Sequence, residues 1–202
     1  NEKIETLMRE LHHRVKNNLQ IISSLLSLQS IKLENSEAKK AVNEGKQRIR
    51  AMSLIHQKLY QNDDVISLQI GQYITNLVDE LSQSYGYKNK VDIQINIPNI
   101  SLDADTSLPI GLIVNELVSN AFKYAYDDNK QPILKLDLIK DSQVEIYHLN
   151  IADNGPGLPD TLDFKEATSF GLRLVNLLIK QLKGSLRINS NDGLCYIITF
   201  SL

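Results

Sequence analysis

The spacing of apolar residues changes near residue 65, and this change limits what the chain can fold into. From residue 4 to about residue 33, apolar residues recur every three or four positions with no Gly or Pro between them, which is the pattern of one long helix. Asn35 and Ser36 break the pattern, with Ser36 as the expected N-cap, and a second helical run continues to Leu59. The two runs predict an antiparallel two-helix hairpin.

The hairpin carries a wider apolar stripe than two helices can bury between themselves. Members of the stripe on the first helix are Leu7, Leu11, Ile21, Ile22, Leu25, Leu26 and Leu28. We therefore expect the hairpin to pair with a second copy, as a four-helix bundle in a homodimer.

Strand-like and helix-like runs alternate after residue 65. Alternating apolar residues predict strands over residues 91–97, 134–139, 144–151, 185–189 and 195–202. Helical spacing predicts helices over residues 70–84, 105–124 and 171–182. The expected fold class is thus α + α/β, a helical hairpin followed by an α/β sandwich with helices on one face of a mixed sheet.

Composition excludes several classes of protein. Apolar residues make up 42% and charged residues 23% of the 202 positions, as in ordinary globular proteins, with no apolar run long enough to span a membrane and no signal-peptide pattern. A net charge of −2 argues against a nucleic-acid-binding face. Cys195 is the only cysteine, so no disulfide can form within the chain, which favours the cytoplasm.

A small polar patch on the first predicted helix could react with phosphate. Glu10 and Asn17 lie three residues before and four after His13, so they share its face. A neutral imidazole is a nucleophile whose second nitrogen can be held by a carboxylate such as Glu10. His12 points about 100° away around the helix and is the second candidate acceptor. On its own, the patch fits a solvated polar face better than catalysis.

A second polar pair interrupts the apolar helix predicted over residues 105–124. Glu116 and Asn120 lie one turn apart on one face, and their carboxylate and amide oxygens could hold a hydrated magnesium ion. Lys123 and Tyr124 follow directly, as a cation for phosphate and a ring for a base. Each of these residues alone has an ordinary surface or packing explanation, whereas together they predict a nucleotide site.

The segment Asp153-Asn-Gly-Pro-Gly157 follows a strand-like run. Gly155 and Gly157 allow the backbone to turn and to approach a ligand closely. The Asp153 carboxylate could accept a hydrogen bond from the exocyclic amine of adenine and repel the carbonyl of guanine, which favours ATP over GTP. A structural Asp-Gly turn is the alternative for this segment alone.

A polar connection over residues 158–168 could fold over a ligand as a lid. Ser169-Phe-Gly-Leu172 then opens the next predicted helix, and the first-turn amides around Gly171 could bind phosphate oxygens. A single glycine before a helix is a weak signal. Its position after the motifs at Glu116 and Asp153 strengthens it.

In their order and spacing, these motifs resemble the sensor histidine kinases of two-component systems, in the subgroup whose phosphoacceptor segment reads H-R-x-K-N. The resemblance covers nearly all of the chain. It implies a dimerisation and phosphotransfer hairpin over residues 1–62 and an ATP-binding domain of the gyrase, Hsp90, histidine kinase and MutL type over residues 66–202. By this likeness, His13 is the phosphorylated residue.

The resemblance also implies roles for the second half of the chain. Asn120 matches the Mg²⁺-binding asparagine of the N box, with Glu116 one turn before it and Lys123 and Tyr124 at its phosphate and base contacts. The glycine boxes are matched by Asp153, Gly155 and Gly157 for the first and by Gly171 for the second.

Three departures from the family pattern affect these roles. Arg14 follows His13 where mainstream relatives carry a carboxylate, so we expect Glu10 to handle the proton. Ser169 replaces a usual glycine and the lid segment is short, which weakens the expected lid contacts to the γ-phosphate. Gly193 is followed by Leu194 where the family often has Thr soon after a late glycine, so no role is predicted there.

The expected function is a cytoplasmic, dimeric kinase core that binds Mg·ATP, phosphorylates His13 and donates the phosphoryl group to an aspartate of a response-regulator receiver domain. The likeness also implies a sensor domain upstream, and no contact with nucleic acid or membrane is expected. Two alternatives are a gyrase- or Hsp90-like ATPase switch, with Glu116 as the base that activates water, and a signalling scaffold without turnover.

Overall fold

The computed structural model describes residues 2–59, 68–126, 131–141, 143–157, 170–190 and 192–201. Within the two N-terminal helices, it describes no side chains for residues 2–9, 11–13, 55, 58 and 59. The chain divides into two compact units, Asn1–Leu68 and Gln69–Leu202.

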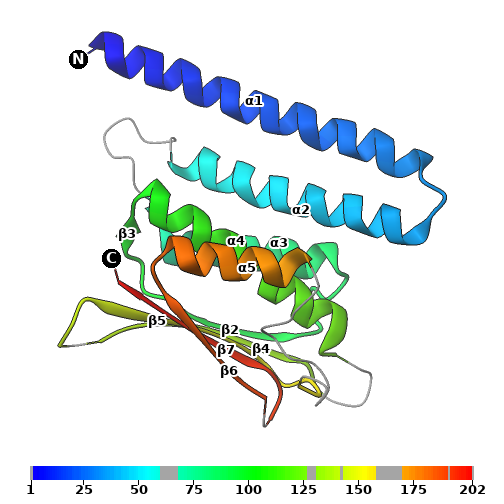
Figure 1. Ribbon diagram of the computed structural model, residues 1–202, viewed down its shortest axis with the longest axis vertical. Helices are drawn as coiled ribbons and strands as arrows, with labels where there is room; N and C mark the ends of the chain where they lie inside the picture. Colours follow the sequence, from blue (N-terminus) through cyan, green and yellow to red (C-terminus); the bar gives the residue numbers. More distant parts are fainter. Residues whose placement is uncertain are drawn as a thin grey trace. The chain divides into compact units, whose positions relative to one another are not determined.

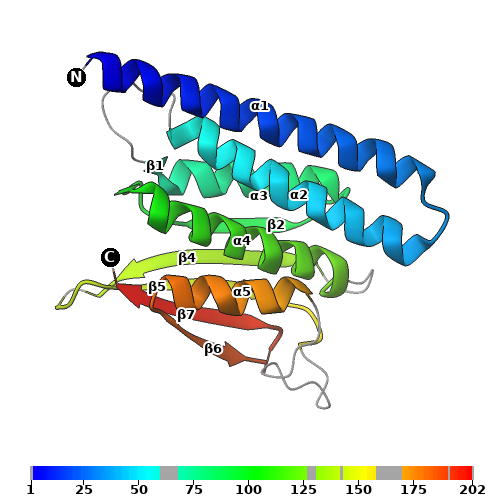
Figure 2. The same ribbon diagram turned by 45° about the horizontal axis from the view of Figure 1, so that its top comes forward.

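The first unit is the expected helical hairpin. Helix α1 spans Glu2–Lys32 and α2 spans Ser36–Leu59, and the two run antiparallel, side by side (Figure 2). Gly45 on α2 faces α1, where an added Cβ would make only an ordinary contact, 3.9 Å from Cδ1 of Leu26. The Ser30 hydroxyl donates a hydrogen bond across the helices to Oδ1 of Asn43 at 3.2 Å.

The cap of α2 differs from the prediction. Asn35 is the N-cap, because its Oδ1 accepts from the amides of Glu37 at 2.9 Å and Ala38 at 3.1 Å, and its carbonyl accepts from the amide of Lys39. The prediction of Ser36 was therefore wrong by one residue. Asn and Ser cap helices about equally well, so residue type could not choose between neighbours.

Helix α1 leaves much of its apolar stripe uncovered. Leu28 is 60% exposed and Ile31 is 77% exposed, and Ile21, Ile22 and Leu25 are also exposed. These side chains recur at helical spacing, so they form one continuous surface rather than scattered positions.

The second unit contains a five-stranded mixed sheet. Its strands are β2 (Asp92–Asn96), β4 (Ile133–Lys140), β5 (Ile146–Asp153), β6 (Ser185–Asn189) and β7 (Cys195–Ser201). The strand order is β2-β4-β5-β7-β6, and only the β2–β4 pair is parallel. Two strands of two residues each, β1 (Leu68–Gln69) and β3 (Ser101–Leu102), pair separately and are too short for alternation to predict.

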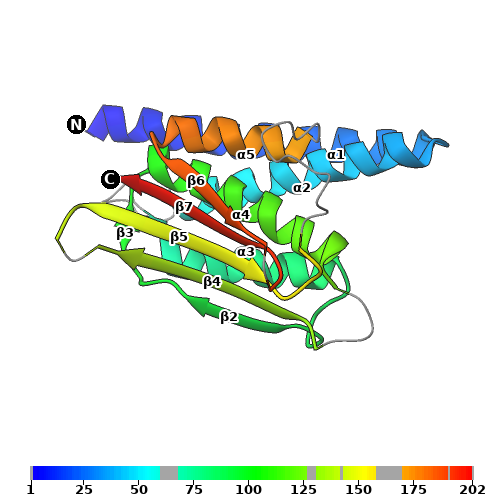
Figure 3. The ribbon, with the colours of Figure 1, turned by 60° about the horizontal axis from the view of Figure 1, so that its bottom comes forward.

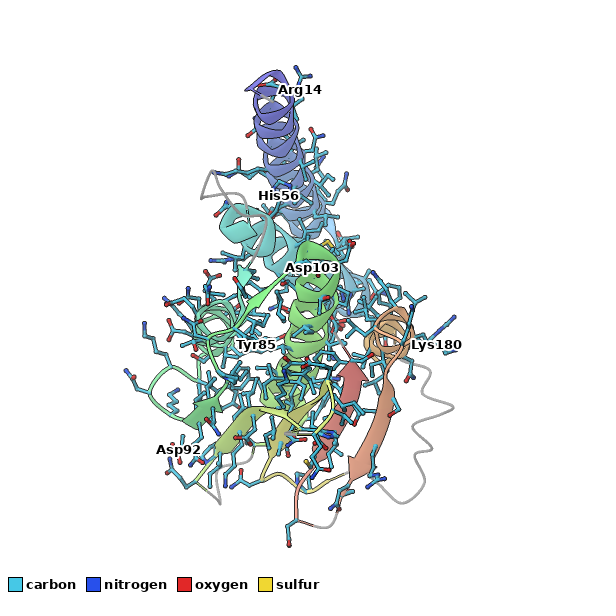
Figure 4. All side chains as sticks on the ribbon, turned by 90° about the vertical axis from the view of Figure 1, so that its left-hand side faces the viewer. Arg14, His56, Tyr85, Asp92, Asp103 and Lys180 are labelled. Atoms are coloured by element: carbon cyan, nitrogen blue, oxygen red, sulfur yellow. The ribbon has the colours of Figure 1, made fainter. Side chains whose placement is uncertain are left out.

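Three helices cover one face of the sheet (Figures 1 and 3). They are α3 (Ile70–Ser84), α4 (Ala104–Tyr124) and α5 (Phe170–Gln181). Alternate sheet residues such as Leu134, Leu149 and Ile198 are fully buried beneath them, as a sheet with one covered face requires. Asp103 is the N-cap of α4 (Figure 4), and its side chain accepts a hydrogen bond from the amide of Thr106. The expected α/β architecture is confirmed.

Candidate functional site

The predicted phosphoacceptor patch lies on α1. Glu10 and Asn17 are exposed, and Oε1 of Glu10 accepts a hydrogen bond from Nε of Arg14 at 2.8 Å. His12 and His13 are helical, but their side chains lie outside the described part of the chain. The partner that the structure gives Glu10 is thus Arg14, one turn later, in an exposed ion pair of the kind that adds little stability.

The polar pair on α4 is set in a buried stretch. Glu116 is only 5% exposed, and the side-chain Nδ2 of Asn115 donates to its Oε1 at 3.2 Å. Asn120 is half-buried one turn later. Oδ1 of Asn115 and Oγ of Ser119 are buried with no hydrogen-bond partner among the described residues. No role was predicted for Asn115 or Ser119, although polar residues in an otherwise apolar helix are a signal in the sequence.

Glu116 and Asn120 carry a carboxylate and a side-chain amide, whose oxygens are the kinds of ligand that a hydrated cation accepts. The described residues include no group of three or more His, Cys, Asp or Glu side chains that could hold a metal. A cation beside Glu116 and Asn120 would therefore take most of its ligands from water and phosphate, which suits Mg²⁺.

Aromatic rings surround the end of α4. Lys123 places its Nζ 6.0 Å from the ring centroid of Tyr85, which follows α3 (Figure 4), close enough for a cation–π interaction. Tyr124, the expected base contact, is 65% exposed. Phe122 stacks on Tyr87 with ring centroids 5.4 Å apart. The expected phosphate-binding cation is thus positioned beside a packed aromatic cluster.

Asp153 ends β5 and is held through its backbone and one carboxylate oxygen. Oδ1 accepts from the amides of Gly155 at 2.9 Å and Leu194 at 3.4 Å, and the Asp153 amide donates to the Leu194 carbonyl at 3.0 Å. Partial burial raises the pKa of Asp153, and the two amide hydrogen bonds oppose that rise.

Glycines permit close backbone contacts on both sides of Asp153. A Cβ on Gly155 would lie 2.6 Å from the carbonyl oxygen of Ala125, so the turn packs directly on the end of α4. Gly157 has φ +77° and lies against Ser190. Gly193 has φ +101°, and a Cβ there would overlap the Asp153 carbonyl oxygen. No role was predicted for Gly193, although the dipeptide Asp-Gly before a strand is a turn signal.

The structure brings the end of α4 and the end of β5 together. The contact of Gly155 with Ala125 joins them, and the charge of Asp153 is among the causes that raise the pKa of Tyr126, after burial. Gly171 is the second residue of α5, whereas the predicted lid and Ser169 lie outside the described residues. His13, Glu10 and Asn17 belong to the other unit.

Two family models match the chain. Residues 10–85 match a histidine kinase model, and residues 105–202 match the histidine kinase-, DNA gyrase B- and HSP90-like ATPase model. The first match covers α1 from residue 10 onward, α2 and α3, and the second covers α4 from residue 105 onward, the sheet strands from β4 onward and α5. Among the described residues, no helix is long and apolar enough to cross a membrane.

The curated relatives are histidine kinases. Sensor histidine kinase PdtaS of Mycolicibacterium smegmatis is 29% identical over 189 residues, which are 90% of this chain and 36% of the relative. Blue-light-activated histidine kinase 2 of Erythrobacter litoralis is 23% identical over 194 residues, which are 92% of this chain and 54% of the relative. The chain thus spans about a third to a half of the length of these relatives.

A solved structure shares the fold. The histidine kinase domain of the Erythrobacter litoralis EL346 blue-light-activated histidine kinase superposes with a TM-score of 0.72 at 22% identity, over 100% of this chain and 93% of that one. With both family models matched in the order that the motifs predicted, the chain belongs to the histidine kinases.

Proposed function

We propose that this chain is the core of a kinase that binds Mg·ATP, phosphorylates itself on His13 and passes the phosphoryl group to an aspartate of a response-regulator receiver domain. One observation supports this best. The segment His13-Arg-Val-Lys-Asn17 lies on a helix of the first unit, and in the second unit the end of α4 meets the turn after β5 at Asp153.

The nucleotide would be held by the second unit. Asp153 would accept a hydrogen bond from the adenine amine, and Tyr124 would contact the base. Glu116 and Asn120 would hold magnesium, and Lys123 and the amides around Gly171 would bind phosphate oxygens. When bound, Mg²⁺ neutralises negative charge on the phosphates. Gly155 and Gly157 would shape this site through their close contacts with Ala125 and Ser190.

The transfer itself requires mainly positioning. A ring nitrogen of His13 attacks the γ-phosphorus, a nitrogen–phosphorus bond forms, and the bond from phosphorus to the β–γ bridging oxygen breaks. ADP leaves with that oxygen. The second ring nitrogen of His13 gives up its proton, for which Glu10 is the nearest carboxylate by helical spacing. Asn17, one turn after His13, completes the polar face.

Glu10 can be tested separately. If Glu10 accepts the proton, Glu10→Gln lowers the rate of autophosphorylation by about 10²-fold, a common contribution of a general base, with unchanged nucleotide affinity. Arg14→Gln, which removes the other member of the ion pair, is the matched control. An unchanged rate in Glu10→Gln would exclude this role.

The first unit would serve as the dimerisation and phosphotransfer domain, over residues 1–62, and residues 66–202 as the catalytic domain. The exposed apolar stripe of α1 supports a homodimer. A single cysteine supports the cytoplasm, and the greater length of the curated relatives leaves room for an upstream sensor domain.

One observation favours a second function, an ATPase switch. Glu116 is buried and its carboxylate accepts from Asn115, as expected for a base that orients water. Such a switch would release phosphate even in the His13→Ala variant.

The kinase is tested by incubating the chain with Mg²⁺ and γ-labelled ATP. We expect acid-labile, base-stable label on the wild type and on His12→Ala, and none on His13→Ala or Asn120→Ala. Label that persists in His13→Ala contradicts the assignment. Phosphate release without label favours the switch, and absence of nucleotide binding favours a scaffold.

A further inference from the structure

We propose that Asn154 is a positioning residue for base recognition, which fixes Asp153 by tying the turn after β5 to the start of β4. The proposal rests on the proposed function, because it concerns how the same nucleotide site selects adenine. Asn154 itself need not touch the nucleotide.

Both ends of the Asn154 side-chain amide bond to the backbone that begins β4. Oδ1 accepts from the amide of Ile133 at 2.9 Å, and Nδ2 donates to the carbonyl of Gln131 at 2.8 Å. Leu134 pairs with Asp153 as the first pair of this part of the β4–β5 ladder. The next position along the ladder would pair Ile133 with Asn154. There the side chain of Asn154, instead of its backbone, bonds to the backbone of β4.

A tyrosine just after the C-terminal end of α4 bonds to the same point. The hydroxyl of Tyr126 donates to the carbonyl of Ile133 at 3.0 Å, so side chains bond both the amide and the carbonyl of this residue. The Tyr126 ring packs edge-on against Tyr87 and tilted against Phe122. Burial, followed by the charge of Asp153, raises the pKa of Tyr126, so its hydroxyl remains a donor at neutral pH.

These contacts determine where the carboxylate of Asp153 lies. The turn that places the Gly155 amide against Oδ1 of Asp153 also presses Gly155 onto Ala125. Asn154 lies between Asp153 and Gly155, so its two hydrogen bonds set the height of the turn relative to β4. Loss of these bonds would let the turn shift and the carboxylate move with it.

The consequence is selectivity for adenine. A carboxylate held in place discriminates an amine from a carbonyl at the same position of the base, and a mobile one does not. Asn154→Ala should therefore weaken binding of an adenine nucleotide more than binding of its 6-oxo counterpart. A residue needed only for stability would weaken both equally.

The test compares Mg·ADP with Mg·IDP, which differ in the amine or carbonyl at this position of the base, by isothermal titration calorimetry on the full chain. The measured quantity is the ratio of Kd for IDP to Kd for ADP. We expect Asn154→Ala to lower this ratio about tenfold, as for a hydrogen bond to a charged group, and Tyr126→Phe to lower it about threefold. Asn150→Ala, the same side chain four residues earlier on β5, should leave the ratio unchanged.

Asp153→Asn separates this inference from the proposed function. Loss of selectivity in Asp153→Asn with a wild-type ratio in Asn154→Ala would overturn the positioning role and leave the proposed function intact. A wild-type ratio in Asp153→Asn would overturn both the adenine contact and the inference. If Asn154→Ala does not fold, Asn154→Asp retains the acceptor and removes the donor to Gln131. A wild-type ratio in that variant and in Tyr126→Phe would also overturn the inference.

Discussion

The two units use apolar residues in opposite ways. In the α/β unit, Leu134, Leu149 and Ile198 are fully buried between the sheet and its helices, whereas Leu28 and Ile31 on α1 are mostly exposed. Burial of apolar surface is the main driving force of folding, so the α/β unit has a core of its own. The hairpin presents apolar surface that a partner could cover. Glycine substitutions, core truncations, pH and helix capping test this contrast in turn.

Substitution of glycine by alanine should give the largest difference in stability change between the two units. Gly193→Ala should lower the free energy of unfolding of the α/β unit by about 4 kcal/mol, because it combines a strained positive φ with an overlap at Asp153. Gly45→Ala in α2 should raise helix stability by about 1 kcal/mol, because its Cβ meets only ordinary contact. Urea unfolding of each variant measures both.

Gly86→Ala is the control for backbone strain alone, because Gly86 also has positive φ but has open space around it. It should lower the free energy of unfolding by about 1 kcal/mol. An equal loss in Gly86→Ala and Gly193→Ala would show that the close contact at Asp153 is not important for stability.

Truncation of a leucine should change the free energy of unfolding nearly as differently in the two units. Leu149→Ala should lower the free energy of unfolding by about 3 kcal/mol, because it leaves a cavity in the core. Leu28→Ala, at an exposed position, should change it by less than about 0.5 kcal/mol in a monomer. Urea unfolding at several protein concentrations measures both, and a concentration-dependent loss in Leu28→Ala would indicate that Leu28 lies in a dimer interface.

A pH series tests the α/β unit through Asp153. Burial raises its pKa in the folded protein, so ionisation opposes folding near neutral pH, and this unfavourable contribution disappears as pH falls through the raised pKa. Protonation also removes the preference for adenine. The ratio of Kd for IDP to Kd for ADP should therefore fall about tenfold on acidification, at a pH above that at which an ordinary aspartate protonates. Asp153→Asn should give a low ratio at every pH, and a flat wild-type profile would contradict the assignment.

The cap of α2 should give the smallest effect. Asn35→Ala removes the acceptor for the amides of Glu37 and Ala38 and should lower the stability of the hairpin by about 1 kcal/mol. Ser36→Ala, the neighbouring control, should change it by a few tenths of a kcal/mol. Thermal unfolding followed by circular dichroism measures the stability of both variants. A larger loss in Ser36→Ala than in Asn35→Ala would show that Ser36 is the cap.

The sequence predicted the elements well because their periods are distinct. The five strands of the main sheet and the five helices of the described residues follow from alternation or from three- and four-residue spacing, and the boundaries agree within a few residues. The strands β1 and β3 were not predicted, since two residues cannot show a period. The predicted N-cap of α2 was wrong by one residue, because Asn35 and Ser36 are both good caps.

The candidate site was predictable in part. Asp153 and Gly155 stand out in the sequence because glycines follow a strand, and in the structure this turn lies against Ala125 at the end of α4. Contacts between distant segments left no local signal. Gly193 reaches Asp153 from 40 residues away in the chain, and Asn154 and Tyr126 meet at Ile133. Such pairs follow from strand register, which the sequence does not reveal.

Transfer of phosphate to one imidazole is the central claim, and localisation of the modification tests it most directly. The chain is incubated with Mg·ATP, digested at neutral to alkaline pH to preserve phosphohistidine, and sequenced by electron-transfer fragmentation. The account predicts phosphate on His13. Phosphate on His12 or any other residue, or an unmodified chain under conditions in which ATP binds, would contradict it.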